Sequence, residues 1–422
     1  MAGVLDELTW RGLIAQSTDQ EALKAELAAG PITYYCGFDP TAPSLHIGNL
    51  VQILTLRRLQ LAGNSPIGVV GGATGLIGDP KMTGERTLND PDVVAGWVER
   101  IREQIAPLLD FDGQFAARMV NNLEWTSEMT AIGLLRDVGK YFRMSTMLGR
   151  ETVAARMASD QGLSYTEFSY QVLQAMDYRE LRRRYGCILQ TGGNDQWGNL
   201  VAGVELIRRA DGVTAHALTT PLITKADGTK FGKTESGTVW LDPAMTSPYA
   251  FSLFWLNTDD RDVIGYLGVF TFRDQDEIAD LAAEVAAHPE RREAQRVLAG
   301  EVTALVHGEA ARQGAIDAAQ ALFGRGELAR LDEATLAAAV AGLPSAIVGE
   351  SDPLVIDLFA ASGLERGKGA ARRTMAEGGL YVNNTKITDP DARLTPTDWL
   401  HGRFALLRRG RKTLAIATRA TP

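Results

Sequence analysis

The sequence is poor in cysteine and has no long apolar run. Only two of its 422 residues are cysteines, Cys36 and Cys187, which excludes a disulfide framework and fits a reducing compartment. The longest stretch without a charged side chain, 59–78, contains glycine, proline and polar residues, so it is not a membrane span. The first residues include acids and no apolar core, so we expect no secretory signal. These absences predict a cytoplasmic protein without a membrane anchor.

Charge is distributed unevenly along the chain. The formal net charge is −9, but residues 353–422 hold twelve Lys and Arg and six Asp and Glu, so this tail carries +6 and the first 352 residues carry −15. A basic tail either meets an anionic partner or is a solvated face, and charge alone favours the solvated face. The length predicts two or three domains, and 45% hydrophobic with 23% charged residues is typical of globular proteins.

Apolar patterns predict an α/β architecture up to about residue 245, and a helical region followed by an α+β module after it. Candidate strands at 32–36 and 67–70 enclose a candidate helix, an order typical of a parallel sheet. From about 246 to 325 the apolar residues have helical spacing. Residues 326–352 are interrupted by Ala, Gly and Pro, and we expect a linker there. A compact α+β module follows, so a chain cut near Ser351 is expected to fold without it.

The segment 35–49 has the features of a phosphate site. It leaves a candidate strand and enters a candidate helix, whose free N–H groups and partial positive charge attract phosphate. Gly48 allows close approach to the backbone, and Thr41 and His46 can donate hydrogen bonds to phosphoryl oxygens. A lone His near a helix start usually has no such role, but the complete string is hard to obtain by chance.

A second segment, 230–234, has the sequence Lys-Phe-Gly-Lys-Thr. Two lysines three positions apart on a glycine-flanked loop can close over a polyphosphate. The segment is not a Walker A motif, because Asp227 stands where that motif has glycine. Taken alone, such a loop is more often a solvated turn.

With both motifs present, the chain resembles the class I aminoacyl-tRNA synthetases, with a HIGH-type motif at 46–49 and a KMSKS-type motif at 230–234. Within that class it is similar to the bacterial tyrosyl-tRNA synthetase family over essentially its whole length. Further matching strings are Gly71–Pro80, Val120–Asn122, Glu167–Gln171 and Gly192–Asn199. The last 70 residues resemble an S4-type RNA-binding module.

The resemblance implies an α/β fold with several domains. A Rossmann-like parallel-sheet catalytic domain would be followed by an α-helical domain and a small α+β S4-like domain. The implied bounds are 1–245 for the catalytic domain with a dimer-forming insertion at about 123–165, 246–325 for a helical anticodon-binding domain, 326–352 for the linker and 353–422 for the S4-like RNA-binding domain.

The resemblance also implies an activity, that of a tyrosine–tRNA ligase. L-Tyrosine would react with ATP to give tyrosyl-adenylate and pyrophosphate, and tyrosine would then pass to the 3′-terminal adenosine of tRNA(Tyr). Mg²⁺ would accompany ATP without dedicated protein ligands. The protein would be a homodimer. Met144, Met147, Leu148 and Met157 would either supply apolar contacts between the protomers or belong to the core.

Site residues follow from the resemblance, position by position. Tyr170, Gln174 and Asp177 are spaced i, i+4 and i+7 and share one face of a predicted helix, which by itself indicates only a wet face. The implied tyrosine site, with Asp177 and Tyr35 at the phenol, is Tyr35, Asp79, Tyr170, Gln174, Asp177 and Gln196. The implied ATP site is Gly37, Asp39, Gly48, Gly193, Asp195 and Lys233. The implied catalytic set is Thr41, His46, Asn49, Arg86, Lys230, Lys233 and Thr234. The implied tRNA contacts, the first four near one predicted helix and the last four near another, are Arg366, Lys368, Arg372, Arg373, Arg408, Arg409, Arg411 and Lys412.

Two positions depart from the family pattern. Asn49 stands where the HIGH motif ends in histidine, and its amide can donate a hydrogen bond but cannot be cationic. The loop after Pro80 is one residue short of some relatives, and it stays open whether Lys81 replaces the loop lysine of the family.

Three alternatives remain at this point. A tryptophanyl-tRNA synthetase shares the architecture, but Tyr35 with Asp177 suits a phenol better than an indole. Another class I-type nucleotidyltransferase would share residues 46–48 without needing the basic tail. A non-catalytic RNA-binding relative would be expected to have lost His46 or Lys233, and both are present.

Overall fold

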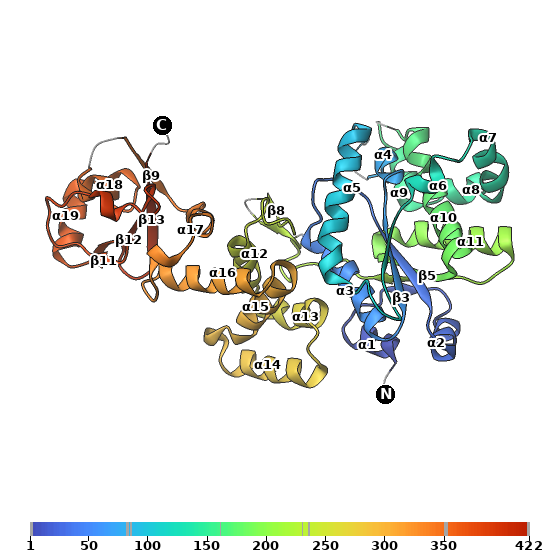
Figure 1. Ribbon diagram of the computed structural model, residues 1–422, viewed down its shortest axis with the longest axis horizontal. Coiled ribbons are helices and arrows are strands. Elements are labelled where there is room, and N and C mark those ends of the chain that lie inside the picture. Colours follow the sequence, from blue (N-terminus) through green and yellow to red (C-terminus); the bar gives the residue numbers. More distant parts are fainter. Residues whose placement is uncertain are drawn as a thin grey trace. The chain divides into compact units, whose positions relative to one another are not determined.

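The chain folds into two compact units (Figure 1). The computed structural model describes residues 3–81, 84, 87–160, 162–229, 231–234, 237–349 and 353–419, with only the backbone of Glu151, Lys233 and Thr234. The first unit comprises 1–245 and 258–298, and the second comprises 246–257 and 299–422. Among the described residues no helix is long and apolar enough to cross a membrane.

The first unit is built on a six-stranded sheet in the order β1-β6-β5-β2-β3-β4. β1 is antiparallel to β6, and the other neighbouring strands are parallel. The apolar runs in β2 and β3 are buried because helices cover both faces, as parallel sheets require. The strands are β1 (Gln16–Ser17), β2 (Thr33–Phe38), β3 (Ser65–Val70), β4 (Arg118–Asn121), β5 (Cys187–Gly193) and β6 (His216–Thr220).

Helices α3 and α5 lie on one face of this sheet, and α10 and α11 lie on the other (Figure 1). The fold is thus the α/β architecture with a parallel sheet that the strand–helix order predicts, and the Rossmann-like arrangement that the resemblance implies. The α-helices of this unit up to residue 211 are α1 (Val4–Trp10), α2 (Gln20–Ala29), α3 (Ile47–Leu61), α4 (Thr74–Ile77), α5 (Pro91–Ile105), α6 (Leu123–Thr126), α7 (Ala131–Gly133), α8 (Met144–Leu148), α9 (Glu151–Met157), α10 (Tyr165–Tyr185) and α11 (Trp197–Asp211). A hairpin of β7 (Lys233–Thr234) and β8 (Gly237–Thr238) follows, and α13 (Asp260–Phe270) and α14 (Gln275–Ala287) complete the unit, whose boundary falls within α15 (Glu293–His307).

The strand order reverses between β2 and β5. The chain proceeds from β2 through β3 to β4 at one edge, and then from β5 to β6 on the other side of β2. In open α/β sheets, ligands bind beyond the carboxyl ends of the strands at such a reversal. The topology therefore places a crevice after Phe38 and Gly193, the last residues of β2 and β5.

The second unit contains a five-stranded sheet in the order β11-β10-β12-β13-β9. β9 is parallel to β13, and the other neighbours are antiparallel. The strands are β9 (Ser345–Val348), β10 (Leu380–Val382), β11 (Thr385–Lys386), β12 (Phe404–Arg409) and β13 (Thr413–Arg419). The helices are α12 (Pro248–Leu256), α16 (Glu309–Leu322), α17 (Glu333–Val340), α18 (Val355–Ala361) and α19 (Lys368–Ala376).

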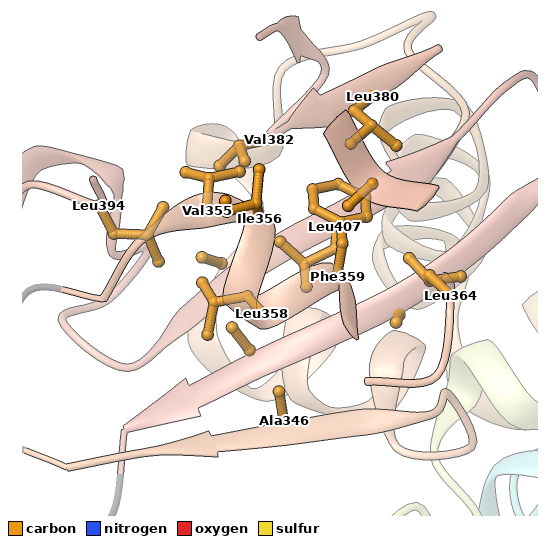
Figure 2. Packing of buried hydrophobic residues seen from close by; sticks show 14 of the residues in the cluster. Ala346, Val355, Ile356, Leu358, Phe359, Leu364, Leu380, Val382, Leu394 and Leu407 are labelled. Carbon is orange, nitrogen blue, oxygen red and sulfur yellow. The ribbon is translucent and has the colours of Figure 1, made fainter. Parts of the chain in front are cut away.

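Apolar side chains cover both faces of this second sheet. On one face, Ile356 and Phe359 of α18 pack with Leu407 of β12 (Figure 2). On the other face, Phe404 and Leu406 pack against α16 and α17. Successive β12 residues therefore serve two different cores, as the two-residue period of a strand dictates.

The expected linker over 326–352 is wrong in its structure. Residues 333–340 form α17, whose Leu336 and Val340 are buried, and 345–348 form β9, which pairs with β13. The Ala, Gly and Pro residues separate short packed elements rather than mark an unstructured connection. Helices are present over 246–325 as the spacing predicts, but they are divided between the two units.

Candidate active site

His46 and Asn49 cap the start of helix α3 reciprocally. The N–H of Gly48 donates to His46 Nδ1 at 3.0 Å, and the N–H of His46 donates to Asn49 Oδ1 at 3.1 Å. Because Nδ1 accepts, the neutral imidazole carries its proton on Nε2. A Cβ at residue 48 would lie 2.8 Å from His46 Cε1, so this geometry needs glycine.

Asp177 is a buried carboxyl group held by two donors. Its Oδ1 accepts from Trp125 Nε1 at 2.7 Å and its Oδ2 accepts from Asn122 Nδ2 at 2.9 Å. Burial raises the pKa of Asp177 to about 7, although these two hydrogen bonds lower it. The group is therefore close to its titration point at neutral pH.

A chain of hydrogen bonds connects Asp177 with Asp39 at the end of β2. Asn122 Nδ2 also donates to Thr74 Oγ1 at 3.0 Å, and Thr74 Oγ1 donates to Asp39 Oδ1 at 2.6 Å. The hydroxyl of Tyr170 donates to Asp39 Oδ2 at 2.7 Å. Both carboxylate oxygens of Asp39 thus bind protein donors, and Asp39 fixes the ring of Tyr170.

Three polar atoms in the same region are buried without a hydrogen-bond partner among the described residues: Tyr35 OH, Gln174 Oε1 and Gln190 Oε1. Tyr35 and Gln190 are direct neighbours on β2 and β5. Burial, followed by the charge of Asp177, raises the pKa of Tyr35 well above its ordinary value. Buried polar groups are nearly always paired, so these atoms indicate a site for a ligand with a polar end.

Asp79 belongs to a second polar network. Its Oδ2 accepts from Gln196 Nε2 at 3.0 Å and its Oδ1 accepts from Asn199 Nδ2 at 3.3 Å. Asn199 Nδ2 also donates to Gln196 Oε1 at 2.9 Å, and Arg150 Nη1 donates to Asn199 Oδ1 at 2.8 Å. The Asp79 carboxylate is therefore oriented by Gln196 and by Asn199 of α11, and Arg150 holds Asn199 in turn.

The loop of the second motif is docked on α13. The ring of Phe231 lies 5.1 Å from that of Tyr266 and 5.3 Å from that of Phe270, measured between centroids. The backbone of Lys233 and Thr234 forms β7, which pairs with β8. Their side chains, and the whole of Lys230 and Arg86, lie outside the described residues.

These groups line a cavity of about 660 Å³, within the range of small-molecule sites. It lies at the reversal between β2 and β5 that the topology indicates. Fourteen residues that the sequence analysis proposes for tyrosine, ATP or catalysis line it: Tyr35, Gly37, Asp39, Thr41, His46, Gly48, Asn49, Asp79, Tyr170, Gln174, Asp177, Gly193, Asp195 and Gln196. The described residues contain no group of three or more His, Cys, Asp and Glu arranged to hold a metal ion.

The eight basic residues that the resemblance implies for tRNA contact fall into two groups. Arg366, Arg372, Arg373, Arg411 and Lys412 are exposed and have no ion-pair partner among the described residues. Three others have protein partners. Lys368 Nζ lies 2.9 Å from Asp357 Oδ2, Arg409 Nη1 lies 3.7 Å from Glu365 Oε1, and the guanidinium of Arg408 lies 3.9 Å from the ring centroid of Tyr381.

The second basic cluster lies in a hairpin rather than near a helix, which corrects the prediction. Arg408 and Arg409 end β12, while Arg411 and Lys412 lie in the turn before β13. The preceding run Phe404–Leu407 alternates between two cores and is therefore a strand.

Sequence reasoning missed the residues that support the predicted ones. Thr74, Asn122 and Trp125 orient the two carboxylates, and Gln190 adds a buried amide. Asn122 lies in one of the matching strings, but nothing local indicates its partner, Asp177, which is 55 positions away. Trp125 has no local signal at all.

Comparison with known proteins finds two matching family models. Residues 27–324 match the family described as tRNA synthetases class I (W and Y), and residues 335–417 match the tyrosine–tRNA ligase SYY-like C-terminal domain. The chain is 62% identical to the tyrosine–tRNA ligase of Streptomyces avermitilis over 98% of both chains. It is 60% identical to that of Acidothermus cellulolyticus over the whole of both chains.

A solved structure shares the fold. A C-terminally truncated mitochondrial tyrosyl-tRNA synthetase from Aspergillus nidulans has a TM-score of 0.68 and 30% identity, with 75% of this chain and 92% of that chain covered. A tryptophanyl-tRNA synthetase from Encephalitozoon cuniculi has a TM-score of 0.56 at 15% identity, which shows the fold alone. By full-length similarity to the bacterial enzymes, the chain belongs to the tyrosine–tRNA ligase family of class I tRNA synthetases.

Proposed function

We propose that this chain joins L-tyrosine to tRNA(Tyr) in two steps. L-Tyrosine reacts with ATP to give tyrosyl-adenylate and pyrophosphate, and the tyrosyl group then passes to the 3′-terminal adenosine of the tRNA. Similarity to tyrosine–tRNA ligases over the whole chain supports the activity. One feature of the cavity supports tyrosine as the amino-acid substrate: a buried carboxyl group, Asp177, lies near the unpaired hydroxyl of Tyr35.

The tyrosine side chain is proposed to enter with its phenol between Tyr35 and Asp177. The phenol then gives the Tyr35 hydroxyl a partner and adds a hydrogen bond at Asp177, whose two oxygens already accept from Asn122 and Trp125. Phenylalanine would leave the Tyr35 hydroxyl buried and unpaired, which costs about 1–3 kcal/mol. The ammonium group is proposed to meet Asp79, Tyr170 and Gln174. The substrate carboxylate lies toward Gln196, whose amide is held by Asp79.

ATP is proposed to bind at the opposite side of the cavity, over the start of α3. Gly37, Gly48 and Gly193 let the nucleotide approach the backbone closely, and Asp195 is proposed for the ribose hydroxyls. Asp39 is also proposed for the ATP site because it lines the cavity, although its carboxylate accepts from the Tyr170 hydroxyl. Mg²⁺ is proposed to enter with the phosphates, whose oxygens are ligands that it prefers.

Catalysis is proposed to be positioning and charge stabilisation. The substrate carboxylate attacks the α-phosphorus, the bond to the pyrophosphate oxygen breaks, and no general base is needed because the nucleophile is already ionised. The donors proposed for the developing phosphoryl charge are Thr41, His46, Asn49, Arg86, Lys230, Lys233 and Thr234. The capped imidazole supports this role for His46, since it presents Nε2–H as its donor.

The protein is proposed to act as a homodimer. Six of the 17 exposed large hydrophobic side chains of the described residues lie in the segment 123–165: Leu123, Ile132, Leu135, Met144, Met157 and Tyr165. That share is large for a tenth of the chain, and exposed apolar patches mark interaction surfaces. Met147 is buried and belongs to the core, and Leu148 is half-buried.

The tRNA is proposed to contact the exposed cations of the second unit. Arg366, Arg372, Arg373, Arg411 and Lys412 offer charge without an ion-pair partner in the described structure. The resemblance also implies Lys368, Arg408 and Arg409, but their intramolecular partners make them weaker candidates. Phosphate contacts release counterions, so the affinity should fall steeply with salt.

ATP–pyrophosphate exchange driven by tyrosine, phenylalanine or tryptophan tests the proposal. We expect exchange with tyrosine only. Tyr35→Phe should reduce the preference for tyrosine over phenylalanine up to about tenfold, the value of one neutral hydrogen bond of 0.5–1.5 kcal/mol.

The adjacent Tyr34 is a matched control. It is equally buried, but its hydroxyl donates to the carbonyl of Leu56, on the other face of the strand. Tyr34→Phe should leave the preference unchanged. Equal exchange with tryptophan, or no exchange with any amino acid, would contradict the proposed activity.

A further inference from the structure

Arg156, at the end of the short helix α9, is one of the largest fully buried side chains of the described chain, with 1% of its surface exposed. It forms an ion pair with Glu167 of α10, with 2.9 Å between Nη2 and Oε2, and Glu167 is 2% exposed. A buried charge is retained only when it is paired and hydrogen-bonded. Its remaining hydrogen bonds therefore show what this arginine holds.

Each of the five N–H groups of Arg156 has a partner. Nη1 donates to the carbonyls of Lys81 and Gly84, both at 2.7 Å. Nε and Nη2 donate to the carbonyl of Gly162 at 3.2 and 3.0 Å, and the second Nη2 bond goes to Glu167. Only a planar guanidinium presents five donors in this fixed fork.

The clamp lies behind two walls of the cavity. Lys81 and Gly84 form an antiparallel bridge in the loop that begins two residues after Asp79. Glu167 lies one helical turn before Tyr170 on α10. Arg156 thus fastens the chain after Asp79 to the first turn of the helix that carries Tyr170, and it touches neither side chain.

We infer that Arg156 is a positioning residue that sets the distance between Asp79 and Tyr170, the two groups proposed for the ammonium end of the amino acid. The inference rests on the proposed function. A shift of Lys81 and Gly84 moves Asp79 away from the position it needs for the ammonium group. Tyr35 and Asp177, at the phenol end, keep their positions. The loss should therefore be confined to ligands that carry an ammonium group.

Binding of two ligands by calorimetry tests this. The probes are L-tyrosine and 3-(4-hydroxyphenyl)propionate, which is tyrosine without its amino group. Arg156→Lys keeps the charge opposite Glu167 but cannot bridge both loop carbonyls and Gly162. We expect the Kd for tyrosine to rise at least tenfold and the Kd for the analogue to change less than twofold.

Arg179→Lys is the matched control. Arg179 lies on α10, is 9% exposed and is paired through two 2.8 Å bonds with Asp211, but it does not line the cavity. It should change neither Kd. If Arg156→Lys does not fold, the double variant Arg156→Met/Glu167→Met removes the clamp together with both charges, a replacement that buried ion pairs often tolerate, and the same ratio is expected.

The outcomes separate the two proposals. Equal weakening of both ligands by the Arg156 variants, or no weakening of either, overturns the positioning role. Failure of the unmodified protein to bind tyrosine overturns the proposed function instead.

Discussion

A chain that ends near residue 351 should lose the packing of α16 and α17, because the cut removes the strands that cover their apolar face. In the full chain Leu322, Leu336 and Val340 are at most 3% exposed. They share one cluster with Phe404 and Ile416 of β12 and β13. If residues 326–352 were a linker, a cut near residue 351 would leave every core intact. In this structure the same cut exposes the core between α16, α17, β12 and β13.

The size of the effect follows from five side chains. The apolar residues of α16, α17 and their connection that lie in this cluster are Leu322, Leu328, Leu331, Leu336 and Val340. Each contributes about 1.5–3 kcal/mol when fully buried, so fully uncovering all five costs about 7.5–15 kcal/mol. The whole stability of a domain is about 5–15 kcal/mol. The remnant of the second unit should therefore not keep its fold.

Calorimetry, binding of a hydrophobic dye and tyrosine-dependent pyrophosphate exchange on one truncated preparation measure this. We expect a smaller heat of unfolding, increased dye binding and retained exchange, since the described cavity residues all belong to the first unit. The full chain with Arg372→Gln and Arg373→Gln is the control, because it removes exposed charge and no core. It should unfold like the unmodified chain while binding tRNA less tightly and with less salt dependence. A truncated chain with unchanged dye binding and a sharp elution profile would refute the reasoning.

The other expected outcomes concern the cavity. Trp125→Phe removes a hydrogen bond to the Asp177 carboxylate that contributes about 1.5–3 kcal/mol, so the pKa of Asp177 should rise by about one to two pH units. The pH profile of tyrosine binding should shift upward with it, and an unchanged profile would show that the titration of Asp177 does not control tyrosine binding. The folded-state pKa of Asp177, about 7, lies above its unfolded value of 3.8, so its contribution to the free energy of unfolding falls as pH rises from about 4 to about 7. Asp177→Asn should abolish that slope in denaturant titrations, and a persisting slope would assign it to other groups. Asn49→Leu removes the acceptor for the N–H of His46 and Gly48→Ala displaces the imidazole, so both should slow adenylate formation in rapid-quench experiments, whereas Asn49→His should retain it; wild-type rates in both impaired variants would make the cap purely structural.

Local patterns were sufficient for much of the first unit. The predicted strands at 32–36 and 67–70 are confirmed as β2 and β3, and the helix between them is confirmed as α3. These elements are consecutive and their apolar periods differ clearly, so the residues within each segment are sufficient to predict whether it is a strand or a helix. The shared face of Tyr170, Gln174 and Asp177 is likewise a property of one helix, α10.

Contacts between distant segments could not be predicted from local patterns. β9 is only four residues long and pairs with β13, about 70 positions later. Its sequence, Ser-Ala-Ile-Val, is too short to distinguish a strand from a connection. Arg156 has the same difficulty, because three of its partners are backbone carbonyls, which carry no sequence signal.

The division of the chain between the two units has a consequence for its synthesis. Helix α12 belongs to the second unit, where its buried Phe251 and Trp255 lie and where it packs against α16, yet residues 258–298 of the first unit intervene. About 50 residues separate the end of α12 from the start of α16, and a ribosome adds roughly 5–20 residues per second. For several seconds during synthesis, the aromatic side chains of α12 are therefore exposed because α16 has not yet been translated. This makes α12 a natural site for a chaperone to bind.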